Sequence, residues 1–289
     1  MNRTILPRLL ISGLVVAWGA SARVAAADPG ASPSNEYHLP LRTAVTFVTD
    51  AETSPGIWAQ VGTAYGAEKD NATPQPVEHV FDTTLLFAYG QEKWEVGSVL
   101  PIFDSSNHAG RGLHNTHDGI GDLAFWGKFL PVRNEHITAG GGLGITTPTG
   151  THSFGSTNVG FEPFVTAAEP VGPVSIREHL GYQTYTDNHD DSLMYSLAAL
   201  YPYSSVVGFR AELVGQHGFD HGQVADPIGA FPSTWRRGSD PVSILPGIDL
   251  QGVEAGWEIL MRITGGGGLT KAAPDYQFGF SLVFAKIMQ

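Results

Sequence analysis

The feature that most constrains the fold is an alternation of apolar and polar residues, repeated in stretches of about ten residues along the chain. In the stretch 79–90, for example, Phe81 and Leu85 fall on one side while Asp82 and Thr84 fall on the other. Successive side chains of a strand point to opposite faces, so this period of two predicts β-strands. The chain is therefore expected to be all-β, built from strands with one apolar and one polar face.

The stretches are separated by connections that alternate between short and long. Tight connections such as 91–92 and 170–172 follow every second stretch, and the intervening ones are longer, up to 219–241. Short turns at one end and long loops at the other are typical of outer-membrane β-barrels, which have an even number of strands. We therefore predict a transmembrane antiparallel up-and-down β-barrel over residues 56–289, with both termini on the periplasmic, short-turn side. The twelve predicted strands are 56–68, 79–90, 93–103, 119–130, 137–149, 157–169, 173–186, 192–202, 206–218, 242–251, 255–264 and 275–286.

A soluble β-sandwich would also show alternating strands, so the polar face decides between the two architectures. That face carries Asp, Glu, Lys and Arg, which a sandwich core could bury only at a large desolvation cost. The aromatic residues of the apolar face lie near strand ends, where a barrel meets the two membrane interfaces. Both observations favour the barrel.

The first 27 residues predict a cleaved secretory signal peptide. Arg3 and Arg8 form a basic start, residues 9–18 are apolar, and three alanines precede Asp28. The apolar run of about 10 residues is too short for a spanning helix, which needs about 20. Residues 28–55 are expected to form a periplasmic or lumenal segment, because the alternation at 39–49 would otherwise add an odd thirteenth strand.

The charge balance argues against nucleic acid as a partner. The chain has 28 acidic and 16 basic residues, a formal net charge of −12, and no basic cluster. It has no cysteine, and hence no disulfide and no thiolate metal ligand. The expected surroundings are outer-membrane lipid outside the barrel and a small-molecule solute within it, and no cofactor is expected.

Six short motifs follow one another along the chain. They are residues 52–56 (ETSPG), 94–101 (WEVG leading to LP), 119–128 (GIGDL leading to Lys128), 147–150 (TPTG), 240–247 (DPVSILPG) and 273–276 (APDY). In this order and spacing they resemble the outer-membrane family named for the MetA pathway of phenol degradation, over most of the chain after the signal peptide. The resemblance implies a channel or transporter for small, aromatic or hydrophobic compounds, inserted by the barrel-assembly machinery. Barrels of that type usually end on an aromatic residue that this machinery reads, whereas here five residues follow Phe284.

Charged residues at polar-face positions are the candidate functional residues. In a barrel this face lines the lumen, where charges either set solute selectivity or pair across strands and fill the interior. Both signs occur on one strand, as with Arg210 and Glu212, so both interpretations stay open. An excess of acidic residues predicts that an open pore prefers cations and neutral solutes. The lumen-lining candidates are Asp82, Glu95, Asp122, Lys128, Glu162, Arg177, Arg210, Glu212, Asp249, Glu258 and Arg262.

Other functions have weaker support. Histidines and acidic residues gather in three predicted outer loops, at 108–118, 187–191 and 217–221, but polar loops of an acidic chain collect such residues anyway, and no metal site is predicted. His152 and Ser153 are adjacent without an identifiable orienting acid, so the chain is not expected to be an enzyme. The alternative to a channel is a structural or interaction barrel that acts through its outer loops, chiefly 107–118 and 219–241.

Overall fold

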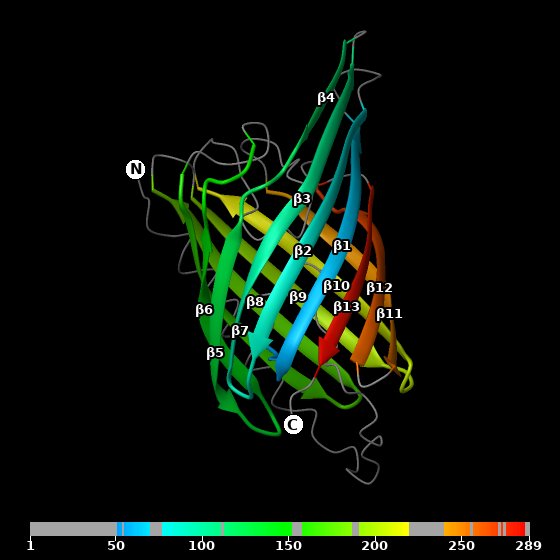
Figure 1. Cartoon of the computed structure of the whole chain (residues 1–289). Coiled ribbons are helices and arrows are strands. Elements are labelled where there is room, and N and C mark those ends of the chain that lie inside the picture. The colour runs from blue at the N-terminus through cyan, green and yellow to red at the C-terminus, as the bar shows by residue number, and fades with distance from the viewer. Residues whose placement is uncertain are drawn as a thin grey trace, which may run out of the picture. The chain divides into compact units, whose positions relative to one another are not determined.

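A computed structural model shows the architecture of residues 36–289, which form one compact unit. Within its described part, the chain forms thirteen β-strands that belong to a single sheet (Figure 1). The expected signal peptide and the alternating stretch 39–49 lie outside the described residues. The described ranges are 51–53, 55–69, 77–110, 113–151, 158–186, 191–219, 240–254, 257–270, 273 and 276–286. The strands are β1 Gly56–Lys69, β2 Val77–Gly90, β3 Trp94–Gly110, β4 Leu113–Gly119, β5 Ala124–Arg133, β6 Thr138–Thr146, β7 Gly160–Val171, β8 Val174–Tyr185, β9 Ser192–Pro202, β10 Val207–Gly218, β11 Val242–Glu254, β12 Trp257–Gly268 and β13 Tyr276–Lys286.

The sheet closes on itself. Each strand pairs antiparallel with its neighbours, and the ring is completed because β1 pairs with β13 from Ile57↔Lys286 to Ala67↔Tyr276. β4 and β5 both pair with the same edge of β3: β5 pairs with its first part, 94–99, and β4 with its last part, 104–110. Together β4 and β5 therefore occupy one place in the wall. The described strands thus fill twelve places, and the predicted all-β, twelve-stranded antiparallel barrel is confirmed. Among the described residues there is no helix with the length and apolarity needed to cross a membrane.

Short turns gather at one end of the barrel and long connections at the other, as the sequence predicts. The turn between β7 and β8 consists of Gly172 and Pro173 alone, and Gly172 adopts a φ of 60° that side chains other than glycine rarely accept. We call the two ends of the barrel the short-turn end and the long-loop end.

The structure departs from the predicted strands on one side of the barrel. β3 runs to Gly110 and pairs with β4, so residues 104–110 and 113–119 form two paired strands that extend beyond the wall where a loop was expected (Figure 1). The register shifts between Thr83 and Thr84, opposite Pro101, whose missing amide hydrogen cannot join the ladder. The resulting bulge turns both Ile102 and Phe103 outward, where both are exposed.

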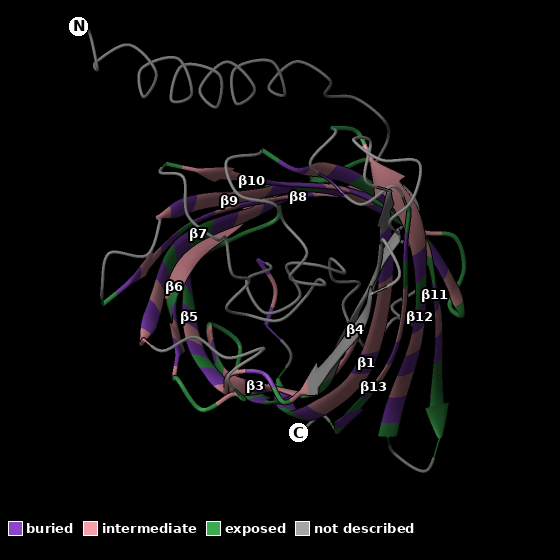
Figure 2. Ribbon diagram, turned by 90° about the horizontal axis from the view of Figure 1, so that it is seen from above, coloured by how far each residue is buried: buried purple, intermediate pink, exposed green. Residues whose placement is uncertain are grey.

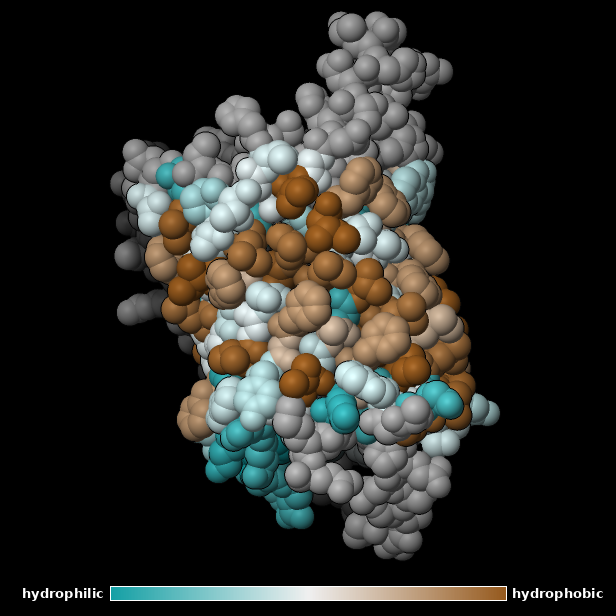
Figure 3. Space-filling model, viewed as in Figure 1, coloured by the Kyte–Doolittle hydropathy of each residue, from teal (hydrophilic) through white to brown (hydrophobic). Residues whose placement is uncertain are grey.

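The outer surface of the barrel is apolar. Exposed Phe87, Phe125, Val165 and Ile248 come from four different strands, and in Figure 3 such residues form a band across the wall with hydrophilic residues below it. A soluble protein rarely exposes so large an apolar area, whereas lipid requires it.

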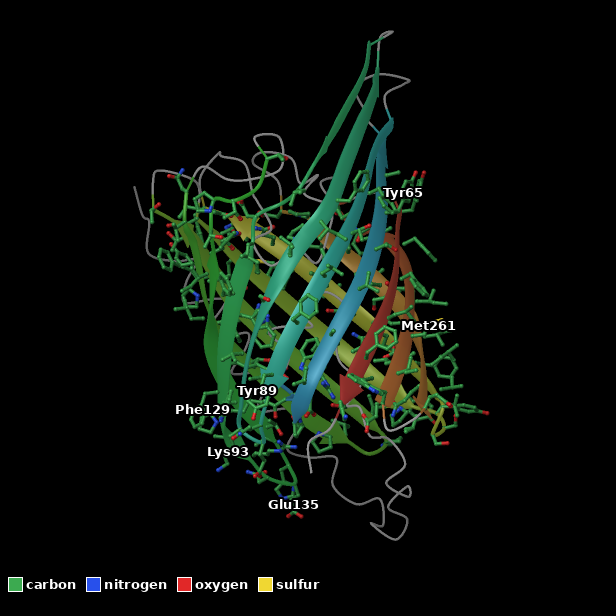
Figure 4. All side chains as sticks on the ribbon, in the orientation of Figure 1. Tyr65, Tyr89, Lys93, Phe129, Glu135 and Met261 are labelled. Carbon is green, nitrogen blue, oxygen red and sulfur yellow. The ribbon has the colours of Figure 1, made fainter. Side chains whose placement is uncertain are left out.

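Aromatic residues mark both edges of this band. Near the short-turn end, Tyr89 and Trp94 meet edge to face with ring centroids 5.5 Å apart, and near the long-loop end Tyr65 and Tyr276 lie 6.1 Å apart. Figure 4 shows Tyr89 and Tyr65 toward opposite ends of the barrel, with the polar Lys93 beyond Tyr89. Aromatic girdles of this kind are typical of the membrane interfaces of transmembrane barrels.

Candidate functional site: the lumen

The lumen is lined by the buried positions of each strand. β5, for example, alternates between buried Ala124, Trp126 and Lys128 and exposed Phe125 and Phe129. A closed single sheet has only one enclosed side, so the buried side chains are those that point inward (Figure 2). The candidate site therefore consists of the side chains at these inward positions.

One part of the lumenal wall is apolar. It is formed by inward residues of six strands that adjoin around the ring, β12, β13, β1, β2, β3 and β5. At its centre Trp58 and Trp126 lie with their rings 6.2 Å apart. They can meet because the residues between them in the same cross-strand row are Ala88 and Gly97, which leave the space free. The cluster consists of Trp58, Leu86, Ala88, Val99, Ala124, Trp126, Leu260, Val283 and Ala285.

A buried ion pair lies beside the two tryptophans. Glu95 of β3 and Lys128 of β5 are directly opposite in register, their Oε1 and Nζ atoms are 2.9 Å apart, and both side chains are 0% exposed. Trp58 donates a hydrogen bond from Nε1 to Glu95 Oε2 at 3.3 Å, and Lys128 Nζ lies 5.5 Å from the centre of the Trp126 ring. A carboxylate and an ammonium held this far from water depend on each other for their charged forms.

A second charged cluster lies on β10, β11 and β12. Asp249 forms ion pairs with two arginines, at 3.0 Å from Arg210 Nη2 and 3.3 Å from Arg262 Nε, and it accepts a hydrogen bond from Arg262 Nε. All three side chains are at most 4% exposed, and Arg262 is directly opposite Asp249 in register. Gly247 allows this arrangement, because a Cβ there would lie 2.6 Å from Arg210 Nε.

A third pair joins β7 and β8. His179 Nε2 lies 3.7 Å from Glu162 Oε1, and the imidazole is 5.7 Å from the ring of Phe164. Gly181 makes room for the pair, since a Cβ there would lie 2.7 Å from Glu162 Oε1. These groups belong to a polar stretch of wall from β7 to β12, which adjoins the apolar cluster at β12, while the Glu95–Lys128 pair lies within the apolar part on β3 and β5.

Uncharged polar side chains continue this polar stretch toward the long-loop end. Gln216 donates from Nε2 to Ser192 Oγ at 2.8 Å, and Ser192 in turn donates to Gln183 Oε1 at 3.0 Å. Gln183 donates from its Nε2 to the hydroxyl of Tyr185 at 2.8 Å. The four side chains join β8, β9 and β10 through hydrogen bonds inside the lumen.

Most of the predicted candidates occupy inward positions of strands. Buried ones are Glu95, Lys128, Glu162, Arg177, Arg210, Glu212, Asp249, Glu258 and Arg262, and Asp82 is half-buried. Asp122 differs, because β4 ends at Gly119 and β5 begins at Ala124. Its Oδ1 accepts from the amides of Thr149 and Gly150 at 3.0 and 2.7 Å, so it fixes the connection after β6.

Some inward polar groups were missed by the sequence analysis. His179, Gln183 and Ser192 sit at inward positions of predicted strands, so the alternation itself could have identified them. Glu52 precedes the first strand, and its carboxylate nevertheless lies 3.3 Å from Arg177 Nη2. No periodicity marks that position.

The histidine loops give no metal centre in the described part of the chain. There, no three His, Asp, Glu or Cys side chains gather closely enough to hold an ion. His217 pairs with Asp240 at 2.7 Å at the long-loop end. Of the other loop candidates, 187–190 and 220–221 lie outside the described residues, as do the side chains of 108–118 and the residues His152 and Ser153.

Comparison with solved structures shows what the barrel resembles. The "COG4313 outer membrane channel from Pseudomonas putida F1" matches with a TM-score of 0.60 at 14% identity, over 89% of this chain and 100% of that one. The "KdgM porin" (TM-score 0.45, 10% identity, 78% and 98% covered) and a "TodX monoaromatic hydrocarbon channel" mutant (0.45, 9%, 81% and 91%) are more distant. At 14% identity the first match shows a shared fold alone.

Comparison with sequences identifies the family. No curated protein matches the chain. The profile of the family described as "Putative MetA-pathway of phenol degradation" matches residues 77–233, which is more than half of the chain and runs from β2 to beyond β10. The resemblance seen in the six motifs is thereby confirmed, and the chain belongs to this family of phenol-degradation MetA-pathway proteins.

Proposed function

We propose that the protein is a bacterial outer-membrane channel for small aromatic or hydrophobic compounds, and that it has no catalytic role. The observation that carries the proposal is the uneven lining of the lumen, in which an apolar wall around two tryptophans, with the Glu95–Lys128 pair set into it, faces a wall of paired charges and amides. Binding sites for small molecules are commonly lined by apolar side chains with a few polar groups. A solute with an aromatic ring and one polar substituent can pack its ring on the apolar wall and hydrogen-bond to the polar wall. A barrel of twelve strands is wider than the eight-stranded barrels that side chains fill.

The orientation in the membrane forms part of the proposal. The short-turn end faces the periplasm and the long-loop end the outside, as in other outer-membrane barrels. Residues 1–27 act as the export signal, the barrel-assembly machinery inserts the chain, and the apolar band contacts lipid. The likeness to a protein named an outer membrane channel supports this setting.

The first test measures ionic current through the purified protein in a planar lipid bilayer. We expect discrete conductance, and we expect added phenol to interrupt it in a concentration-dependent way. Replacing both Trp58 and Trp126 by leucine should weaken this block about two- to tenfold, since the aromatic contact of the solute with this pair contributes about 0.5–1.5 kcal/mol beyond its area.

A matched control is Trp257→Leu, because Trp257 is 41% exposed on β12, which places it on the outer face. This variant should leave the phenol block unchanged. Folded protein that conducts no ions under any condition would instead support a structural or interaction barrel that acts through its outer loops.

Selectivity gives a second prediction. The unmodified channel should prefer potassium to chloride, because the chain is acidic overall. Asp249→Asn should move the reversal potential toward that of an anion channel, since it leaves Arg210 and Arg262 without their shared carboxylate. Asp122→Asn is the control and should change nothing, because Asp122 holds a connection outside the strands. Chloride preference in the native protein would contradict the charge argument.

A further inference from the structure

The chain segment directly before β1 makes specific contacts with the barrel. Ala51 and Thr53 are 0% and 2% exposed. Glu52 forms an ion pair with Arg177, 3.3 Å between Oε1 and Nη2, and the Thr53 hydroxyl donates to the backbone carbonyl of Glu92 at 2.9 Å. In the view from above, a short buried piece of chain lies inside the ring of strands, apart from the wall (Figure 2).

These two contacts are made with different parts of the wall. Glu92 belongs to the turn between β2 and β3, whereas Arg177 is an inward residue of β8. Around the ring, β5, β6 and β7 separate β3 from β8. Because Glu52 and Thr53 are consecutive, this piece of chain connects two parts of the wall that are four places apart around the ring. Both contacts lie toward the short-turn end, since Arg177 is three residues beyond the first residue of β8.

We propose that residues 51–53 form a strap across the short-turn mouth of the lumen, latched by the Glu52–Arg177 ion pair, which restricts passage when closed. The proposal rests on the channel function argued above and adds its regulation. The Glu52 side chain is 21% exposed and that of Arg177 7%. The latch is therefore wetter than the fully enclosed Glu95–Lys128 pair, and its ionic contact is easier to break.

The wall contributes one further contact to the latch. Arg177 Nε lies 3.3 Å from Ser175 Oγ on the same strand, which helps to hold the guanidinium toward Glu52. Arg133 donates from Nη1 to the same Glu92 carbonyl that Thr53 contacts, at 2.6 Å, so the other anchor point is also fixed. Each end of the strap thus meets a positioned group.

The experiment uses the full-length protein and two independent measurements. The first is conductance in planar bilayers for the native protein, Glu52→Gln, and the charge exchange Glu52→Arg with Arg177→Glu. We expect Glu52→Gln to raise the time-averaged conductance several-fold, because the glutamine keeps the shape and loses the ionic attraction. The charge exchange should return it toward the native value.

The second measurement follows the strap itself. The chain has no cysteine, so Ala51→Cys provides one thiol at a fully buried position. Its reaction with a maleimide should be slow in the native background and several-fold faster with Glu52→Gln. Glu135→Gln, on an exposed turn, is the control and should alter neither measurement.

The two measurements separate the strap from the channel. Unchanged labelling with Glu52→Gln overturns the strap, whatever the conductance shows. Faster labelling with conductance equal to that of the native channel also overturns it as a restriction, while the channel function stands. If labelling is faster but no protein conducts, the channel function fails and the gating role fails with it.

Discussion

Glu95→Gln is expected to destabilise the barrel by about 3–5 kcal/mol, because it leaves Lys128 as a buried charge without its carboxylate. The size of the effect follows from the complete enclosure of both side chains. The same substitution also replaces the charged acceptor of the Trp58 indole hydrogen bond. Urea unfolding in detergent micelles, followed by tryptophan fluorescence, measures the change as a lower midpoint.

Two further variants show whether the charge or the packing is responsible. Glu95→Gln combined with Lys128→Met removes both charges, and should recover most of the lost stability, since buried ion pairs are often replaceable by uncharged groups of similar size. Glu135→Gln disrupts the exposed Glu135–His136 pair and should change stability by less than about 1 kcal/mol. A single Glu95→Gln variant as stable as the native protein would mean that the pair does not depend on its charge.

The strands could be predicted from the sequence because lipid and lumen impose opposite requirements on alternate residues. β9 has the predicted bounds, 192–202, and short and long connections alternate as predicted, except that the connection expected at 104–118 is the β3–β4 hairpin. The β3–β4 hairpin was not predicted, because residues 104–118 are mostly polar and show no alternation of apolar and polar residues. These residues pair through their backbones as strands, and side-chain periodicity gives no signal of such pairing.

The site was only partly predictable for a related reason. Arg262 opposite Asp249 follows from the short turn between β11 and β12, which fixes the local register. Glu95 opposite Lys128 does not, since the β3–β4 hairpin lies between them in the chain. Asp122 fits the alternation formally, but the backbone leaves the strand there and Gly121 bonds to the carbonyl of Pro101. Glu52 depends on a contact 125 residues away in sequence.

Glycine on the inward face of β6 has a packing role that alternation does not reveal. Gly140, Gly142 and Gly144 are the inward residues of this strand, and the neighbouring strands place large groups over them. The ring of Phe164, directly opposite Gly142 in register, occupies the space that a side chain at Gly142 would need. A Cβ at Gly142 would lie 2.5 Å from Phe164 Cζ and 2.2 Å from the carbonyl oxygen of Gly127.

Gly142→Ala is therefore expected to destabilise the barrel by about 1–3 kcal/mol, because the Phe164 ring and the β5 backbone must both move to admit the methyl group. Gly127→Ala is the matched control on the adjacent strand. A Cβ there meets only Val96 Cγ1, at an ordinary 3.5 Å, and replacing a strand glycine by alanine at such a site stabilises by up to about 1 kcal/mol. The two variants should thus shift the urea midpoint in opposite directions. Equal midpoints would show that the Phe164 ring does not lie over β6. The ring would then not pack beside His179 of the His179–Glu162 pair as described.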